Sequence, residues 1–244
     1  MNKVTENNEP FDILDELENG TDVILRSDQP VVVYLDGIRF RHVTRNLDKP
    51  FDERFHDAML ETARRMSHHF MLNFAVVASD KFALVRFNKD ERMSIWCGQS
   101  RDRILSSVSS MASVILMETC RRMDVDLALF PSFAGHVMNA IDKDEAASIL
   151  VALEQRHRNK SVSHLVHHVL GSQKEKLKVS ELKQKLSEAG APWDGMPAKY
   201  KHGSAIRREP SKNGDMKFFI KSIPQPLFYR ENLVADIFYG NSGD

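Results

Sequence analysis

Two carboxylates in this sequence have the surroundings that metal and phosphate chemistry requires. Residues 31–35 read VVVYL and are followed at once by Asp36 and Gly37. A second carboxylate, Asp80, lies in a turn between two apolar runs. If that hairpin packs beside the first strand, both carboxylates face one point, where they repel each other unless a cation lies between them. Mg²⁺ suits such a pair, because it is usually held by one or two carboxylates together with substrate phosphates.

The residues after Asp36 suggest what else this point would bind. Gly37 lets the backbone approach a ligand closely, so that its carbonyl or the N–H groups after it can touch metal or phosphate. Arg39, Arg41 and, farther along, Lys49 could neutralise a triphosphate. Each feature also has a plainer interpretation, since Asp-Gly after a strand and Ser-Asp at a hairpin tip are ordinary turn sequences. Spacing alone leaves both interpretations open.

Alternating strands and helices would position these residues. Period-2 and apolar runs predict strands at Thr21–Arg26, Val31–Leu35, Phe74–Ala78, Phe82–Phe87, within Leu127–Ala140, at Ser204–Arg208 and at Phe218–Ile220. Helical spacing predicts helices from an N-cap at Asp52 to Phe70, from Arg101 to Met123, over Glu145–Arg156, Ser161–Leu170, Ser172–Glu188 and within Phe228–Phe238, with a Pro/Gly loop at Ala191–Gly203. This alternation predicts an α/β (α+β) sandwich with a mixed, mostly antiparallel sheet flanked by helices.

Composition places the chain among ordinary globular proteins. Of its 244 residues 42% are hydrophobic, and 34 Lys and Arg balance 34 Asp and Glu, so there is no global basic field that would indicate nucleic acid. Two cysteines without a CxxC motif predict reduced thiols in a cytoplasmic protein. The polar N-terminus has no signal-peptide core, and no apolar run is long enough for a membrane span, so we expect no membrane partner.

The order of the motifs resembles that of the tRNA-His guanylyltransferase family. Members carry a strand ending in DGxxFxxF, then KPND, a helix, and SDEYSF in a hairpin. The matching segments here are Asp36–Phe40, Lys49–Asp52 and Ser79–Leu84, followed by Arg101–Ser107 for the RxSKxxS-type helix, Pro131–Gly135 for the PPSFDGR strand and Pro197–Ser204 for the LPxxxRKGT segment. The resemblance covers about Val31–Arg208.

This resemblance implies a polymerase- or cyclase-like palm that adds a nucleotide to an RNA 5′ end in the 3′–5′ direction, with GTP or ATP as substrate. It implies that Asp36 and Asp80, with the Gly37 carbonyl, hold two Mg²⁺ ions. The implied nucleotide contacts are Gly37, Ile38, Arg39, Phe40, Arg41 and His42 around the triphosphate, with Lys49, Asp52, Ser79 and Arg103 in the pocket. The family is commonly tetrameric, so we expect a homo-oligomer, either a dimer or a tetramer. NTP and tRNA or another RNA are the expected partners.

Three departures separate this chain from the family pattern. Lys81 replaces the acidic residue that normally follows Asp80, so it would lower metal affinity or bind phosphate instead. Gln99 and Ser100 stand where arginines are expected, and the segment 160–166 replaces a HINNLYN helix that helps to bind the second nucleotide and the RNA. We therefore expect metal chemistry to be kept and tRNA-His specificity to be lost.

These departures leave alternatives open. The chain could be a nucleotide-binding sensor or assembly module that kept the palm and lost turnover, or an enzyme that makes a small product from NTPs. His164 and His168 form an i, i+4 pair, but no third ligand has suitable spacing, so a solvent- or partner-facing helix surface is the simpler interpretation.

We divide the chain into four regions. Residues 1–20 are expected to be a flexible or helical arm, and residues 21–140 the palm-like catalytic domain. Residues 141–208 would be a helical, family-specific region packed on the palm, and residues 209–244 a C-terminal extension of unknown role.

Overall fold

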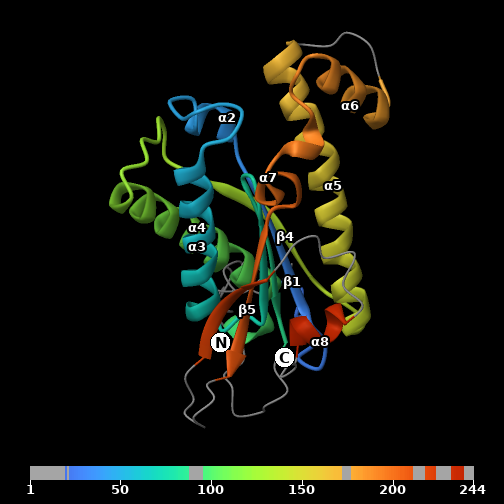
Figure 1. Ribbon diagram of the computed structural model, residues 1–244. Helices are drawn as coiled ribbons and strands as arrows, with labels where there is room; N and C mark the ends of the chain where they lie inside the picture. Colours follow the sequence, from blue (N-terminus) through green and yellow to red (C-terminus); the bar gives the residue numbers. More distant parts are fainter. Residues whose placement is uncertain are drawn as a thin grey trace, which may run out of the picture.

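The computed structural model describes residues 20, 22–87, 96–171, 177–210, 218–223 and 232–238. In these ranges six strands form one sheet, and every pairing is antiparallel (Figure 1). The strands are β1 (Val31–Gly37), β2 (Phe74–Ala78), β3 (Lys81–Arg86), β4 (Phe133–Asn139), β5 (Ser204–Pro210) and β6 (Phe218–Ile223). Their order across the sheet is β4-β1-β3-β2-β5-β6. The α/β fold expected from the sequence is confirmed.

Helices cover both faces of this sheet. The helices are α2 (Phe40–Val43), α3 (Glu53–His69), α4 (Arg101–Arg122), α5 (Lys143–Leu170), α6 (Val179–Glu188), α7 (Ala198–His202) and α8 (Leu233–Phe238), with 3₁₀ turns at Trp96–Gln99 and Trp193–Gly195. Figure 1 shows α3 and α4 on one side of the sheet and α5 on the other. Within the described ranges, none of the helices combines the length and apolar character that a membrane crossing would require.

The alternation of side chains along β1 explains why the strand is apolar throughout. Val31, Val33 and Leu35 pack in the core under α3 and α4, whereas Val32 packs on the opposite face with residues of α5 and α8. Successive side chains of a strand point to opposite faces, so a strand buried on both faces is read as a continuous apolar run.

Three elements differ from the sequence-based expectation. The stretch Ala191–Gly203, expected to be a Pro/Gly loop, contains the 3₁₀ turn Trp193–Gly195 and the short helix α7. Of the strand expected at Thr21–Arg26, the described residues 22–26 form only one isolated bridge, between Ile24 and Ser100. The two helices expected at 145–156 and 161–170 are a single helix of 28 residues, α5. The residues between the two expected helices, 157–160, contain no glycine or proline that would break a helix, and Glu154 and His157 are buried.

The division into regions stays a prediction. The sheet continues past residue 140, because β5 pairs with β2 and β6 pairs with β5. Except for Gly20, the expected N-terminal arm lies outside the described residues, as do large parts of 209–244.

The structure predicts that replacing Gly203, between α7 and β5, destabilises the protein. Its φ is +82°, and a Cβ there would lie 2.3 Å from the Val77 carbonyl oxygen at the end of β2. Gly190 also has a positive φ, +75°, but a Cβ would meet nothing within 4 Å. Both alanine substitutions strain the backbone, and only Gly203→Ala adds a steric overlap. Urea unfolding should show that Gly203→Ala costs about 1–3 kcal/mol more than Gly190→Ala; equal losses would contradict the close approach.

Candidate functional site

The pairing of β1 with β3 brings the two predicted metal ligands to the same end of the sheet. Asp36 lies directly opposite Lys81 in the β1–β3 register. Asp80 precedes Lys81 in the tight β2–β3 turn, and its carbonyl accepts a hydrogen bond of 3.0 Å from the Gly37 N–H. Asp36 and Asp80 therefore approach one point, which the sequence alone could only assume.

The Lys81 ammonium lies between these two carboxylates. It forms an ion pair with Asp36 Oδ1 and lies 3.5 Å from Asp80 Oδ1. The Lys81 side chain is only 14% exposed, against 47% for Asp36. Burial by itself lowers the pKa of Lys81, but the charge of Asp80 and the hydrogen bond to Asp36 outweigh it, so this pKa lies above its ordinary value. Lys81 is therefore a cation at neutral pH.

Helix α5 covers this end of the sheet with basic residues. Lys81 and Tyr34 line a small cavity, of about 20 Å³, together with Arg156 and Lys160 of α5. One turn farther along, partial burial lowers the pKa of His164, and nearby Asp80 acts in the opposite direction. The sheet supplies the acids of the site, and α5 supplies bases opposite them.

The predicted triphosphate segment starts with a turn packed on the core. Phe40 is 4% exposed, and its ring packs at a tilt against the Phe133 ring, with 5.1 Å between the ring centroids, so its side chain is buried and only its backbone can face a ligand. A Cβ on Gly37 would lie 2.3 Å from the Phe40 ring. Close packing against Phe40 therefore explains why residue 37 is a glycine, independently of any ligand. Ile38, Arg39, Arg41 and His42 are exposed around this turn.

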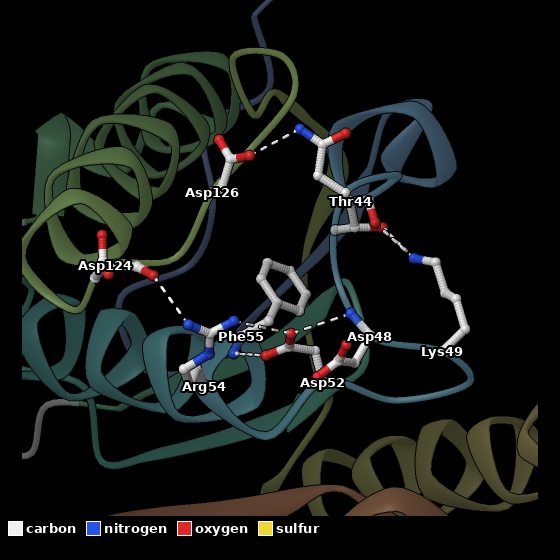
Figure 2. Close-up of polar contacts among 9 residues, drawn as sticks. Thr44, Asp48, Lys49, Asp52, Arg54, Phe55, Asp124 and Asp126 are labelled. Atoms are coloured by element: carbon white, nitrogen blue, oxygen red, sulfur yellow. Dashed lines mark hydrogen bonds and ion pairs between the residues drawn. The ribbon is translucent and has the colours of Figure 1, made fainter.

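Lys49 and Asp52 have local partners at the start of α3 (Figure 2). Asp52 is 7% exposed and caps the helix, because its carboxylate accepts hydrogen bonds from the N–H groups of Phe55 at 2.9 Å and Asp48 at 3.2 Å. The Lys49 ammonium donates to the Thr44 carbonyl at 2.6 Å. Asp52 thus stabilises the loop that carries Lys49. Of these two residues Asp52 is buried and Lys49 is exposed to solvent.

Arg103 does not join the other predicted site residues. It lies in the first turn of α4, whose N-terminus is held by the segment before β1 through the hydrogen bond from Arg101 N to Val23 O. The other end of α4 leads to Asp124, whose carbonyl accepts from Arg54 near the site (Figure 2). A helix of 22 residues spans about 33 Å. The assignment of Arg103 to the nucleotide pocket is therefore corrected: the direction of α4 places it at the far end of the sheet.

The carboxylate pair fits a metal ion under one condition. A cation at the position of the Lys81 ammonium would contact both Asp36 and Asp80, and carboxylate and backbone carbonyl oxygens are ligands that Mg²⁺ accepts. Among the described residues no group of three or more His, Cys, Asp or Glu side chains could hold a metal, so water or substrate oxygens must complete the coordination. The residues fit Mg²⁺ if the Lys81 ammonium leaves this position.

Comparison with known proteins agrees with this geometry. The family model described as "Thg1: tRNAHis guanylyltransferase" matches residues 11–140, which are 130 of the 244 residues and include both carboxylates. The chain belongs to the tRNA-His guanylyltransferase family. This confirms the resemblance that the motif order indicated.

Solved structures of this family share the fold. A bacterial tRNA-His guanylyltransferase (Thg1)-like protein in complex with ATP superposes with a TM-score of 0.81 at 23% identity, covering 95% of this chain and 100% of the other. The same kind of protein in complex with GTP gives 0.75 at 23% identity, covering 92% and 98%. The tRNA-His guanylyltransferase of Saccharomyces cerevisiae gives 0.62 at 15% identity, covering 79% and 91%.

A viral protein is also similar over most of the chain. "Uncharacterized protein R259" of Acanthamoeba polyphaga mimivirus is 23% identical over 238 residues, which covers 86% of this chain and 81% of the viral protein. The similarity therefore extends well beyond the segment that the family model matches.

The basic residues of α5 are the part of this guanylyltransferase-family site that sequence reasoning missed. Arg156, Lys160 and His164 recur every four residues, a spacing that places side chains on one face of a helix. The expected break between two shorter helices interrupted that pattern. A continuous helix over 143–170 would have revealed it.

A buried polar cluster lies beside the cavity and joins α5 to α7. Glu154 is fully buried, His157 is 6% exposed and His202 is 9% exposed. Glu154 Oε1 lies 3.5 Å from His202 Nδ1. Burial lowers the pKa of His157 to about 4, although a hydrogen bond with the Tyr200 backbone raises it in part. The helix that carries the bases thus depends on a histidine that is neutral in the folded protein.

This cluster makes the family member sensitive to mild acid. His157 has a pKa of about 4 when folded and about 6.5 when unfolded, so the unfolded state binds the extra proton between these values. The free energy of unfolding should therefore fall as the pH decreases from about 6.5 to about 4, by up to about 3 kcal/mol from this residue. Burial lowers the pKa of His56 to about 4 as well and also lowers the pKa values of His164 and His202, so His157→Gln should remove only part of the slope.

Denaturant unfolding at several pH values would measure how the free energy of unfolding depends on pH. The control is His68→Gln, at the exposed end of α3, which should leave the pH slope as it is in the unaltered protein. An unchanged slope in His157→Gln would show that this residue is not the proton acceptor.

Proposed function

We propose that the protein is a Mg²⁺-dependent nucleotidyltransferase that adds a nucleotide from GTP or ATP to the 5′ end of an RNA in the 3′–5′ direction. The observation that carries this proposal is the approach of Asp36 and Asp80 to one cation position at the end of the sheet. Membership of the guanylyltransferase family supports it. The ATP and GTP complexes of two relatives support a nucleoside triphosphate as the substrate.

The placement of each residue suggests its role. Asp36 and Asp80 would hold the metal with the Gly37 carbonyl; the second of the two expected ions stays a prediction. When bound, Mg²⁺ supplies positive charge to the attacking and leaving oxygens of an in-line phosphoryl transfer. The exposed Arg39 and Arg41 would contact the triphosphate. The remaining proposed contacts are the backbone of Ile38, Phe40 and His42, the turn residue Ser79 and the ammonium of Lys49.

The acceptor is proposed to be an RNA 5′ end other than that of tRNA-His alone. The segment 160–166 that replaces the family's HINNLYN sequence lies within α5, the helix beside the carboxylates. It carries Lys160, whose ammonium can attract a phosphate backbone without reading a particular base, and His164, which can donate a hydrogen bond to a phosphate. We therefore expect no preference for tRNA-His over other tRNAs or triphosphorylated RNAs.

One observation favours a second candidate function, a nucleotide-binding sensor or assembly module without turnover. The Lys81 ammonium neutralises one of the two carboxylate charges, and a site with less negative charge binds a divalent cation less tightly. Thin-layer analysis of labelled NTP products, with and without RNA, distinguishes the candidates: a 5′-extended RNA supports transfer, a small nucleotide product supports condensation of NTPs, and binding without product supports the module.

Removing either carboxylate should abolish most of the transfer. Asp36→Asn and Asp80→Asn should each lower turnover by at least about 10²-fold, the usual effect of removing one preorganised electrostatic group. The double variant should be little worse than either single one, because both residues act on one cation.

A matched control for these variants is Asp28→Asn. Asp28 is 64% exposed and forms a surface ion pair with Arg26, away from the site, so turnover should stay within about twofold of the unaltered protein. Full turnover in Asp36→Asn or Asp80→Asn, measured with the same labelled NTP, would remove the chemical basis of the proposal.

We also propose that the protein is cytoplasmic and forms a homo-oligomer through β4. This strand lies at one edge of the sheet and pairs only with β1 among the described strands. The stretch Leu127–Ile141 around it has no Asp, Glu, Lys or Arg, although edge strands of soluble proteins usually carry charges that prevent pairing. An uncharged strand can pair antiparallel with the same strand of a second copy about a two-fold axis.

A single lysine on this edge should weaken the assembly. Met138 in β4 is 46% exposed, and Met117 in α4 is 41% exposed. Met138→Lys should shift the protein toward monomers in light scattering after size exclusion, and Met117→Lys, with the same change of charge, should not. An assembly that survives Met138→Lys would place the interface elsewhere, and a monomeric unaltered protein would refute self-association.

A further inference from the structure

We propose that the Lys81 ammonium is the resident cation of the carboxylate pair in the nucleotide-free protein, and that the triphosphate of an incoming nucleotide draws it away. The divalent metal would then enter the site together with the nucleotide and not before it. This inference rests on the proposed function, because it concerns how cation and nucleotide reach the same site.

The position of Lys81 is set by the backbone. Its register opposite Asp36 directs both side chains to the same face of the sheet, the face toward α5. The ammonium contacts Asp36 and lies 3.5 Å from Asp80. Lys81 is 14% exposed, whereas Asp36 and Asp80 are 47% and 24% exposed. The position between the carboxylates is therefore occupied by a side chain that reaches it from the protein interior, and its opposite side is open to solvent.

Charge decides what this position can bind. Two carboxylates and one ammonium carry a net charge of −1, so a divalent ion would meet half of the attraction that the carboxylates alone would exert. Repulsion from the ammonium a few ångströms away accounts for this loss. A free divalent ion is thus disfavoured as long as Lys81 stays in place.

A triphosphate offers the ammonium a better partner. Phosphate oxygens accept strong, charge-assisted hydrogen bonds, and the flexible four-carbon side chain of lysine allows its head group to move. Retreat toward α5 is unfavourable, because Arg156 and Lys160 line the cavity on that side. The remaining direction is outward to solvent, at the end of the sheet where Asp36 is 47% exposed. Moving there, Lys81 would add charge to the triphosphate and leave the carboxylates to the metal.

A direct measurement of metal binding tests whether the metal enters together with the nucleotide and not before it. Mn²⁺ serves as the probe, because its free fraction can be followed by electron paramagnetic resonance without turnover. The unaltered protein should bind Mn²⁺ weakly alone and at least about tenfold more tightly with a non-hydrolysable GTP or ATP analogue. Lys81→Met should bind Mn²⁺ alone at least about tenfold more tightly than the unaltered protein, since a nearby unit charge has been removed. It should also bind the analogue less tightly in EDTA.

Two variants control for charge and folding. Lys160→Met removes the same charge from the same cavity, but Lys160 forms no ion pair with Asp36 or Asp80 in the described part of the chain, so Mn²⁺ affinity should change by less than about threefold. Lys81→Arg keeps the charge and should retain the weak binding of Mn²⁺ alone. Circular dichroism on each variant verifies that the fold is intact, and Lys81→Arg keeps the test valid if Lys81→Met does not fold.

The outcomes separate this inference from the proposed function. If the unaltered protein binds Mn²⁺ alone as tightly as Lys81→Met does, and Asp36→Asn abolishes that binding, Lys81 is not a competing cation and the inference is overturned while the proposed function stands. An equal gain in Lys160→Met would also overturn it. If neither protein binds Mn²⁺ even with the nucleotide analogue, the proposed metal-dependent function itself fails.

Discussion

The register of β1 against β3 is the constraint on which the whole site depends. It places Asp36 opposite Lys81 and, through the turn before β3, brings Asp80 beside both. A slip of one residue would turn every side chain of β1 to the other face. Burial on both faces prevents this, because Val33 and Leu35 would then leave the core under α3 and α4. The hydrophobic core thus determines which charges meet at the end of the sheet.

The two faces of the sheet have different roles. The face under α3 and α4 is apolar almost throughout and includes the large side chains Phe82 and Leu84, so it makes the strand ends rigid. The opposite face changes from apolar to polar along its length, from Val32 through Tyr34 to Asp36. Helix α5 follows the same change, with Leu150 in the core at one end and Lys160 beside the site farther along.

The buried cluster of Glu154, His157 and His202 lies where this face changes character. It binds α5 to α7, and α7 leads through Gly203 into β5. A Cβ at Gly203 would press on Val77, three residues before the Asp80 turn. The geometry of the carboxylates is therefore supported from two sides, by strand register and by the packing of α5 and α7 on the neighbouring strand.

The sequence could predict the parts of the site that depend on local structure. It failed where the direction of a helix, or its continuity, determines where a residue lies. The strand over 31–35, the N-cap at Asp52 and the hairpin that carries Asp80 are local features, and the structure contains all three. Arg103 was assigned to the nucleotide pocket by motif, but helix α4 places it at the far end of the sheet. The direction of a helix is a tertiary property. The two helices expected at 145–156 and 161–170 are one helix, and a partner of its middle part, His202 beside Glu154, lies far along the chain. The contact of Lys81 with both carboxylates depends on register and could not be read from a turn sequence.

The net charge of the site argues that it still binds a ligand. A structural remnant would need no more than Asp36 paired with Lys81, which is neutral. Asp80 adds a second negative charge beside that pair, and carboxylates so close repel each other. Asp36, Asp80 and Lys81 together therefore carry a charge of −1 at a solvent-open sheet end, with Arg156 and Lys160 lining the cavity beside Lys81 and the exposed bases Arg39 and Arg41 following Asp36 along the chain. An arrangement of this kind is stabilised when a cation and a polyanion arrive together, since each compensates charges that the other leaves unpaired. These electrostatics agree with the metal nucleotide proposed above as the ligand, whereas the 23% identity by itself shows only a shared fold.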